Sequence, residues 1–239
     1  MQRLRLRFGR GEEVKFISHL DVMRFWERAF RRAKIPLTYS QGFTPHPRIS
    51  MAAPLAVGVS SEAELMDVWL NRWMPPQSFM MLMRAQLPPG FNVFDVREVG
   101  LKIPSLQSCL AFAEYQVEIR SNKTDEEVKS SLHSLLQTRK LPWHRSREGK
   151  TKLYDLRALI DDLWFIDHRC EHNGEPESIY VLGMRLRCGA EGSGRPEQVT
   201  AALGFLEHPE SIHRCKLTLQ EVSLGEGVQN PSPRSKQNP

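Results

Sequence analysis

The strongest constraint on the fold is the order in which two hydrophobic patterns alternate along the chain. Residues 2–8, Q-R-L-R-L-R-F, end in a strict alternation of basic and apolar residues, which is typical of a half-buried β-strand. We expect Leu4, Leu6 and Phe8 to face a core and the three intervening arginines to face solvent. Residues 18–33, S-H-L-D-V-M-R-F-W-E-R-A-F-R-R-A, change to spacings of three and four, which predict an amphipathic helix.

The predicted helix carries two different faces. Ser18 is a plausible N-cap, because its hydroxyl can accept a hydrogen bond from the first turn. One face is an apolar stripe that we expect to enter the core, made of Leu20, Met23, Trp26, Phe30 and Ala33. The other is basic and is made of Arg24, Arg28 and Arg31.

Further elements follow in a regular order up to residue 99. Segments 49–59 and 63–70 read as two strands joined through Ser60-Ser61-Glu62, although Pro54 indicates that the first is irregular or at an edge. Residues 75–87 begin with two prolines and read as a helix, and residues 91–99 alternate again as a strand. The order is therefore strand, helix, strand, strand, helix, strand, which is that of a ferredoxin-like unit.

The remainder of the chain repeats this order. Strands are predicted at 113–120, 163–170, 178–188 and 213–222, and helices at 124–136 and 195–206. We therefore predict an α+β protein built from tandem duplicated ferredoxin-like (βαββαβ) units with antiparallel sheets. The units are expected at 1–99 and 112–223, with an insertion near 139–162, and the polar segment 225–239 is expected to form a disordered tail.

Composition and cysteine spacing narrow the function classes. The 239 residues are 40% hydrophobic, and no run of roughly 18 apolar residues occurs, so we expect a cytoplasmic protein without membrane contact. The four cysteines are Cys109, Cys170, Cys188 and Cys215, and no Cys-x-x-Cys motif is present. This spacing predicts no metal site, no cofactor and no disulfide framework.

Positive charge is concentrated at the N-terminal end. Residues 1–48 hold eleven Lys and Arg residues against four acids, an excess of seven, whereas the whole chain has a net charge of +5. A local excess of this kind favours a polyanionic partner over a neutral one.

The segment that follows the basic helix is unusually rich in chemistry for a connector. Residues 37–48 read L-T-Y-S-Q-G-F-T-P-H-P-R, in which Gly42 and two prolines predict a shaped loop. Aromatic rings can stack on unpaired bases, an amide can recognise a base edge, and guanidinium groups can bind phosphates. We therefore predict an RNA-binding surface made of Arg24, Arg28, Arg31, Tyr39, Gln41, Phe43, His46 and Arg48. The alternative is that the arginines only form a solvated helix face.

A catalytic reading uses some of the same residues. If the loop returns over the strands, His19, Tyr39 and His46 can act as general acid and base in a metal-independent cleavage of RNA. A metal site of His19, Asp21 and His46 is less favoured, because positions 19 and 21 point in opposite directions on a helix. The structural alternative is that His19 bonds to the backbone at the start of the helix and that His46 stacks between the two prolines. In the insertion, Asp155 and Arg157 are expected to form an ion pair that holds it down.

Two segments carry a family resemblance. The run F-I-S-H-L-D-V-M-R-F-W-E-R-A-F-R-R-A-K-I-P-L-T-Y-S-Q-G-F-T-P-H-P-R-I-S at 16–50, and then Y-D-L-R-A-L-I at 154–160, resemble segments of the bacterial radical SAM-linked protein family, a domain of unknown function. In that family the domain occurs alone or fused behind a B12-binding radical SAM protein, which implies such an enzyme as partner. The chain has no C-x-x-x-C-x-x-C to hold the iron–sulfur cluster, so we expect it not to be the radical enzyme.

These features lead to one functional prediction and two alternatives. We predict a non-catalytic accessory or substrate-recognition module for a separate radical SAM enzyme, binding RNA. The segment S-H-L-D and the element order are also similar to the ferredoxin-like endoribonucleases that process CRISPR repeats, so a metal-independent endoribonuclease is the first alternative. A protein-interaction scaffold is the second.

Overall fold

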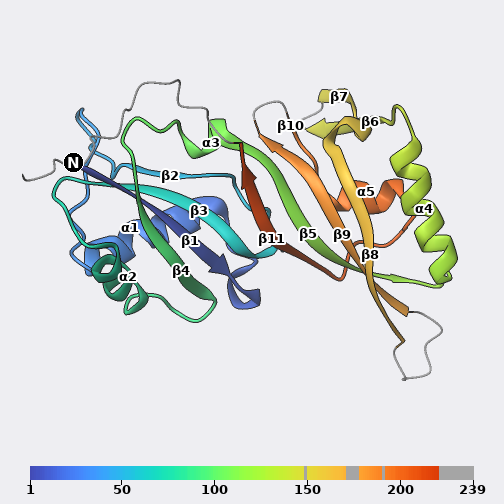
Figure 1. Cartoon of the computed structure of the whole chain (residues 1–239), viewed down its shortest axis with the longest axis horizontal. Coiled ribbons are helices and arrows are strands. Elements are labelled where there is room, and N and C mark those ends of the chain that lie inside the picture. Colours follow the sequence, from blue (N-terminus) through green and yellow to red (C-terminus); the bar gives the residue numbers. More distant parts are fainter. Residues whose placement is uncertain (148–149, 171–177, 190–191, 221–239) are drawn as a thin grey trace, which may run out of the picture.

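The computed structural model describes residues 1–147, 150–170, 178–189 and 192–220. Its N-terminal half contains six main elements in the predicted order, with a short 3-10 turn, η1 (Glu12–Val14), after the first strand. These elements are β1 (Gln2–Arg10), α1 (His19–Arg32), β2 (Ile49–Met51), β3 (Ser60–Leu70), α2 (Pro76–Arg84) and β4 (Phe91–Val99). The strands lie in the order β4-β1-β3-β2, and each neighbouring pair is antiparallel (Figure 1).

The C-terminal half repeats this arrangement after a one-turn helix, α3 (Leu106–Cys109). Its strands lie in the antiparallel order β11-β5-β9-β8, and the two-residue β10 (Gly192–Ser193) extends β9. Its main elements are β5 (Leu110–Ser121), α4 (Asp125–Gln137), β8 (Ile160–Cys170), β9 (Ser178–Gly189), α5 (Pro196–Ala202) and β11 (Ser211–Leu219). A separate hairpin of β6 (Pro142–Arg147) and β7 (Lys150–Asp155), followed by the turn η2 (Arg157–Leu159), forms the predicted insertion. The fold is therefore α+β with a mainly antiparallel sheet.

The predicted antiparallel pairing is present within each half, but the two halves share one sheet, which has nine strands among the described residues. They meet where β11 pairs with β3 in parallel, with His213 opposite Ser60 and Arg214 opposite Ser61. The reason is the length of β2, which covers only residues 66–68 of β3. The rest of that edge of β3 has free backbone groups, and β11 satisfies some of them. We call this junction the seam.

The predicted hairpin at 49–70 also differs from the observed one. Ser60, Ser61 and Glu62 belong to β3 rather than to a turn, and residues 52–59 form no strand. Leu55 and Val59 instead pack into the hydrophobic core of the C-terminal half. Burial of these side chains against the other half competes with local pairing, which residue propensities cannot reveal.

The core of the N-terminal half confirms most of the predicted helix and strand faces. Leu4, Leu6 and Phe8 are buried against α1, and Ser18 caps α1 by accepting a hydrogen bond from the Asp21 backbone. Leu20, however, is exposed rather than buried. The inward stripe begins one turn before Trp26 and consists of Val22, Trp26, Ala29, Phe30 and Ala33. No described helix has the length and hydrophobicity needed to cross a bilayer. Residues 171–177, between two of the predicted strands, and the predicted tail at 225–239 lie outside the described residues.

The arginines of β1 do not all face solvent as the alternation predicted. Arg3 and Arg5 are almost fully buried, and both bind the buried carboxylate of Asp67 on β3, with Nε–O distances of 3.0 and 2.8 Å. Arg3 also donates to the carbonyls of Ile103 and Pro104, in the segment that links the halves. Because this segment covers the outer face of β1, the guanidinium groups of Arg3 and Arg5 stabilise the fold. They are not accessible to a nucleic acid.

A second buried ion pair crosses the seam. Arg214 on β11 and Glu64 on β3 are both almost inaccessible, and Arg214 Nε lies 2.9 Å from Glu64 Oε1. Burial alone lowers the pKa of Arg214, but the charges of Glu64 and then Tyr115 raise it above its ordinary value. Arg10 is buried nearby and donates to the carbonyls of Val14 and Ile17. The seam is thus held by charge as well as by backbone pairing.

We expect Arg214→Met to lower the free energy of unfolding by about 3–5 kcal/mol, because it leaves Glu64 buried without its partner. Urea denaturation measures this change. The double variant Arg214→Met/Glu64→Leu should recover much of the loss, because no unpaired charge remains.

The exposed pair of Arg169 and Glu118, 2.7 Å apart, provides the control for this prediction. Arg169→Ala should change the free energy of unfolding by less than about 1 kcal/mol. If Arg214→Met cost no more than Arg169→Ala, the seam would not depend on the buried pair.

Candidate nucleic-acid interface

The basic face of α1 is exposed as the helical spacing predicted. Arg24, Arg28 and Arg31 are all accessible. Arg24 makes a weak exposed ion pair with Asp21 at 3.4 Å, and Arg28 Nε donates to the carbonyl of Arg24. Within the described part of the chain, the Arg31 guanidinium has no hydrogen bond or ion pair. These contacts are local and exposed, so the three cations remain accessible to a polyanion.

The loop after α1 is a hairpin with its own backbone hydrogen bonds. Thr38 accepts from the Arg48 backbone at 2.7 Å, and the Ser40 backbone donates to the His46 carbonyl at 2.8 Å. The His46 backbone in turn donates to the Ser40 hydroxyl at 3.0 Å. Gly42 has a φ of +132° at the tip, a conformation that favours glycine. The predicted shaped loop is therefore present, and we call residues 38–48 the α1 hairpin.

The side chains of the α1 hairpin point outward. Phe43 is fully exposed, and Tyr39 is exposed over about half of its surface (51%). Gln41 and His46 are also exposed. Arg48 is held in place, because its guanidinium lies 4.6 Å from the ring centre of Trp69. Free aromatic faces beside a positioned guanidinium are the groups that bind unpaired bases and phosphates.

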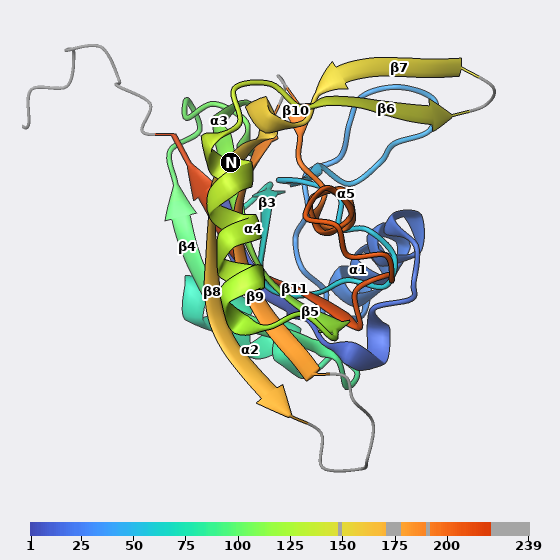
Figure 2. The same cartoon turned by 90° about the vertical axis from the view of Figure 1, so that its right-hand side faces the viewer.

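A second basic hairpin occupies the equivalent position in the other half. The α1 hairpin joins α1 to β2, and the β6–β7 hairpin joins α4 to β8. Figure 2 shows β6 and β7 extending from the sheet on the side of α1 and α5, and the blue segment before β2 extends to the same side. Residues 139–153 hold six Lys and Arg residues against one acid. This hairpin is not part of the predicted RNA-binding surface, although the repeated element order and its basic composition are signals that could have revealed it.

The structure does not bring His19 together with Tyr39 and His46. His19 is the first residue of α1, beside Arg10 and Glu64 at the seam end of β1 and β3. The α1 hairpin is anchored at Trp69, where Thr38 donates to the Trp69 carbonyl. Positions 64 and 69 of one strand are separated by about 17 Å. Among the described residues, no hydrogen bond or ring contact joins His19 to the hairpin.

The surroundings of His19 favour its neutral form. Burial is the largest cause that lowers its pKa, and the positive charge of Arg10 lowers it further, while Glu64 acts in the opposite direction. Asp21 belongs to the alternative hypothesis of a metal site made of His19, Asp21 and His46. In the structure its carboxylate accepts a hydrogen bond from the Ser18 hydroxyl at 2.7 Å. Asp21 thus takes part in the cap of α1.

The expected ion pair of Asp155 and Arg157 is replaced by bonds to the backbone. Asp155 Oδ1 accepts from the Leu141 and Arg157 backbones at 2.8 and 3.0 Å. The Arg157 guanidinium donates to the carbonyls of Leu136 and Ile160. Both residues therefore fasten the base of the β6–β7 hairpin to the end of α4, a structural role close to the predicted one.

Comparison with known proteins identifies the family. Residues 3–196 match the family described as "Uncharacterized protein conserved in bacteria (DUF2344)". The chain belongs to this family. None of the curated proteins matches it.

Several solved structures show a weak similarity to this chain. One, titled "Crystal Structure of a Cbf5-Nop10-Gar1 Complex", has a TM-score of 0.43 and 10% identity, over 89% of this chain and 47% of the other. A second, the "Crystal structure of the archaeal box H/ACA sRNP Nop10-Cbf5 complex", has a TM-score of 0.41 and 9% identity, over 89% of this chain and 46% of the other. The chain spans less than half the length of these proteins, and the likeness concerns the fold alone.

We expect the stability of the protein to fall as the pH drops below about 6.5, the ordinary pKa of histidine. Because the folded state holds the pKa of His19 lower, the unfolded chain binds its proton first, and the free energy of unfolding decreases. His19→Gln should make this part of the pH dependence shallower. Urea denaturation between about pH 5 and 8 tests it, and NMR titration of the His19 ring should give a pKa below that of a free histidine. A His19 pKa at or above the ordinary value would contradict the prediction.

Proposed function

We propose that this protein is a non-catalytic accessory or substrate-recognition module that binds RNA for a separate radical SAM enzyme. The main support for RNA binding is the structure of the α1 hairpin. Its backbone is fixed by cross-strand hydrogen bonds, yet Phe43 and Tyr39 at its surface have their rings in solvent. A rigid loop that displays aromatic rings next to free cations can bind unpaired bases without a large entropic cost.

The roles divide by chemistry within this proposal. The three arginines of α1, together with Arg48, bind phosphates. Tyr39 and Phe43 stack on bases, and Gln41 and His46 bind base edges. The β6–β7 hairpin supplies a second basic contact, because it extends from the same side of the sheet (Figure 2). The radical SAM partner rests on the family resemblance, and the B12-binding type is the kind that the resemblance implies.

We also propose that the chain arose by duplication of a ferredoxin-like unit, with domains at 1–99 and 112–223. The strand orders β4-β1-β3-β2 and β11-β5-β9-β8 support this, since the corresponding strands occupy the same places in each half. The two hairpins after the first helix of each half then correspond to one another. One is short, and the other has grown into the insertion near 139–162.

We expect the affinity for single-stranded RNA to fall linearly on a plot of log affinity against log salt, with a slope of about −0.7 per phosphate contacted. Arg24→Ala, Arg28→Ala and Arg31→Ala should each make the slope shallower. Phe43→Ala or Tyr39→Ala should weaken binding by about 1–3 kcal/mol with little change in slope, because a stacked base is lost rather than a charge. Fluorescence anisotropy over a salt series measures both quantities.

Arg97→Ala is the matched control, because Arg97 is exposed on β4, away from α1 and both hairpins. It should leave the slope unchanged. Salt-independent binding, or no binding, would reject the RNA surface and leave the protein-interaction scaffold. Cleavage in the presence of a chelator that His19→Ala or His46→Ala abolishes without loss of affinity would establish the endoribonuclease alternative instead.

We expect the protein to co-purify with a radical SAM enzyme from its native cells when lysis is gentle and the salt concentration is low. Affinity capture followed by mass spectrometry identifies the partner. Capture should persist after nuclease treatment if the contact is between proteins, and should be lost if RNA alone bridges them. Recovery of the chain without such an enzyme would contradict the partnership while leaving the RNA test intact.

A further inference from the structure

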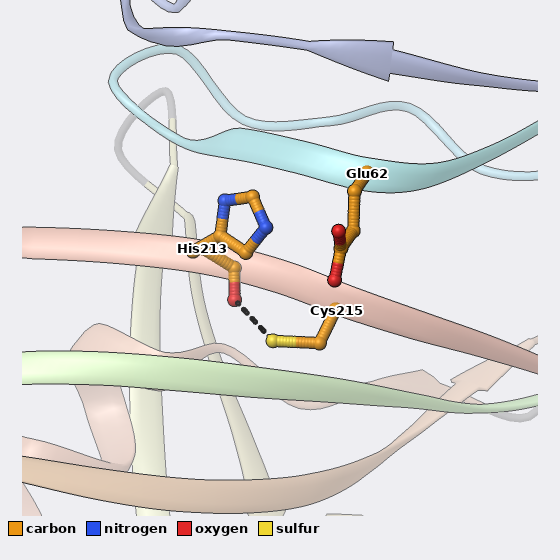
Figure 3. A group of neighbouring side chains, drawn as sticks. All are labelled: Glu62, His213 and Cys215. Atoms are coloured by element: carbon orange, nitrogen blue, oxygen red, sulfur yellow. Dashed lines mark hydrogen bonds between the residues drawn. The ribbon is translucent and has the colours of Figure 1, made fainter. Parts of the chain in front are cut away.

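Three potential metal ligands converge at the seam, on strands that come from different halves. Glu62 lies on β3, and His213 and Cys215 lie on β11. One ligand atom from each residue lies within 4.8 Å of the others. Figure 3 shows the Glu62 carboxylate directed toward the strand that carries the imidazole and the thiol. Glu62 is exposed and the other two are half-buried, so the cluster is open to solvent on one side.

The imidazole of His213 is already oriented for coordination. Its Nδ1 lies 2.9 Å from the Ser60 hydroxyl, which fixes the ring in place. When the Ser60 hydroxyl accepts this hydrogen bond, the ring hydrogen lies on Nδ1 and Nε2 keeps a lone pair that can bind a metal ion. Figure 3 shows one ring nitrogen turned toward Glu62. A histidine whose other ring nitrogen donates to a fixed acceptor is the usual arrangement of a metal ligand.

We propose that Glu62, His213 and Cys215 bind a zinc ion that links the two halves of the protein across the seam. A thiolate, an imidazole and a carboxylate form a ligand set that suits Zn²⁺, and the thiolate disfavours Mg²⁺ and Ca²⁺. Three protein ligands leave the fourth tetrahedral position to water or to an oxygen of a bound molecule. The site is independent of the proposed RNA surface, since it shares none of its residues.

The donor atoms need only small movements to reach a zinc geometry. At zinc–ligand bonds of 2.0–2.3 Å, tetrahedral donors lie about 3.3–3.8 Å apart, so separations within 4.8 Å need to contract by at most about 1.5 Å. The Glu62 side chain is exposed and can change rotamer, and the Cys215 thiol makes a weak contact of 3.7 Å with the His213 carbonyl. When zinc binds, the Cys215 thiol loses its proton to solvent, a Zn–S bond replaces the S–H bond, and no redox change is needed.

The test uses the full chain, stripped with a chelator and then titrated with Zn²⁺ and with Co²⁺. We expect one equivalent of Zn²⁺ to bind and to raise the melting temperature, because the metal binds the folded state only. Co²⁺ should give the thiolate charge-transfer absorption of a cysteine-bound ion. Cys215→Ser should abolish that absorption and weaken Zn²⁺ binding at least tenfold, and Ser60→Ala should weaken binding about 10–100-fold by freeing the His213 ring.

Cys109→Ala is the matched control, because Cys109 is a buried free thiol outside the cluster. It should leave the stoichiometry and the Co²⁺ absorption unchanged. His213→Ala and Glu62→Ala test whether all three residues bind the zinc ion or whether Cys215 binds it alone. Each variant retains Cys215, and each should weaken Zn²⁺ binding if all three residues are ligands. Failure to bind one equivalent of Zn²⁺, or equal binding by wild type and Cys215→Ser, would overturn the proposal.

Discussion

The parallel pairing of β3 with β11, and the buried Arg214–Glu64 ion pair that crosses it, hold the two halves of this protein in one sheet. β2 is too short to cover the edge of β3, so the last strand of the chain completes the sheet there. This single pairing brings together two clusters of polar side chains. Arg214 meets Glu64 in the buried interior, while the half-buried His213 and Cys215 lie next to the exposed Glu62.

Burial also divides the positive charge into two populations. Some arginines of the N-terminal strand are internal, with Arg3 and Arg5 bound to Asp67 and Arg10 bound to backbone carbonyls. The arginines of α1 instead lie outside, next to a loop whose aromatic rings are unburied. The net charge of the chain does not distinguish these two groups of arginines. A buried arginine in an ion pair stabilises the fold, whereas an exposed arginine can attract a polyanion. The candidate interface is therefore smaller than the count of basic residues indicates.

In both halves the segment that projects from the sheet lies at the same place in the order of helices and strands. In each, the connection between the first helix and the next strand of the main sheet becomes a hairpin on the helical side. In the N-terminal half the hairpin is fixed by hydrogen bonds to Trp69, and in the C-terminal half by Asp155 and Arg157. A rigid sheet thus presents two basic hairpins whose relative position depends on the seam, and so the seam determines the geometry of the surface that we assign to RNA.

The sequence by itself determined the local structure. The period-two alternation of β1, the helical spacing of α1, the Ser18 cap, and the shaped loop around Gly42 depend on neighbouring residues, and all are present. Only the tertiary structure decided the rest. Whether Arg3 faces water depends on residues about 100 positions away, and the Glu62–His213–Cys215 cluster joins residues about 150 positions apart. Strand pairing sets these distant contacts, and it depends on which edge remains free after every other strand has paired, which no local pattern contains.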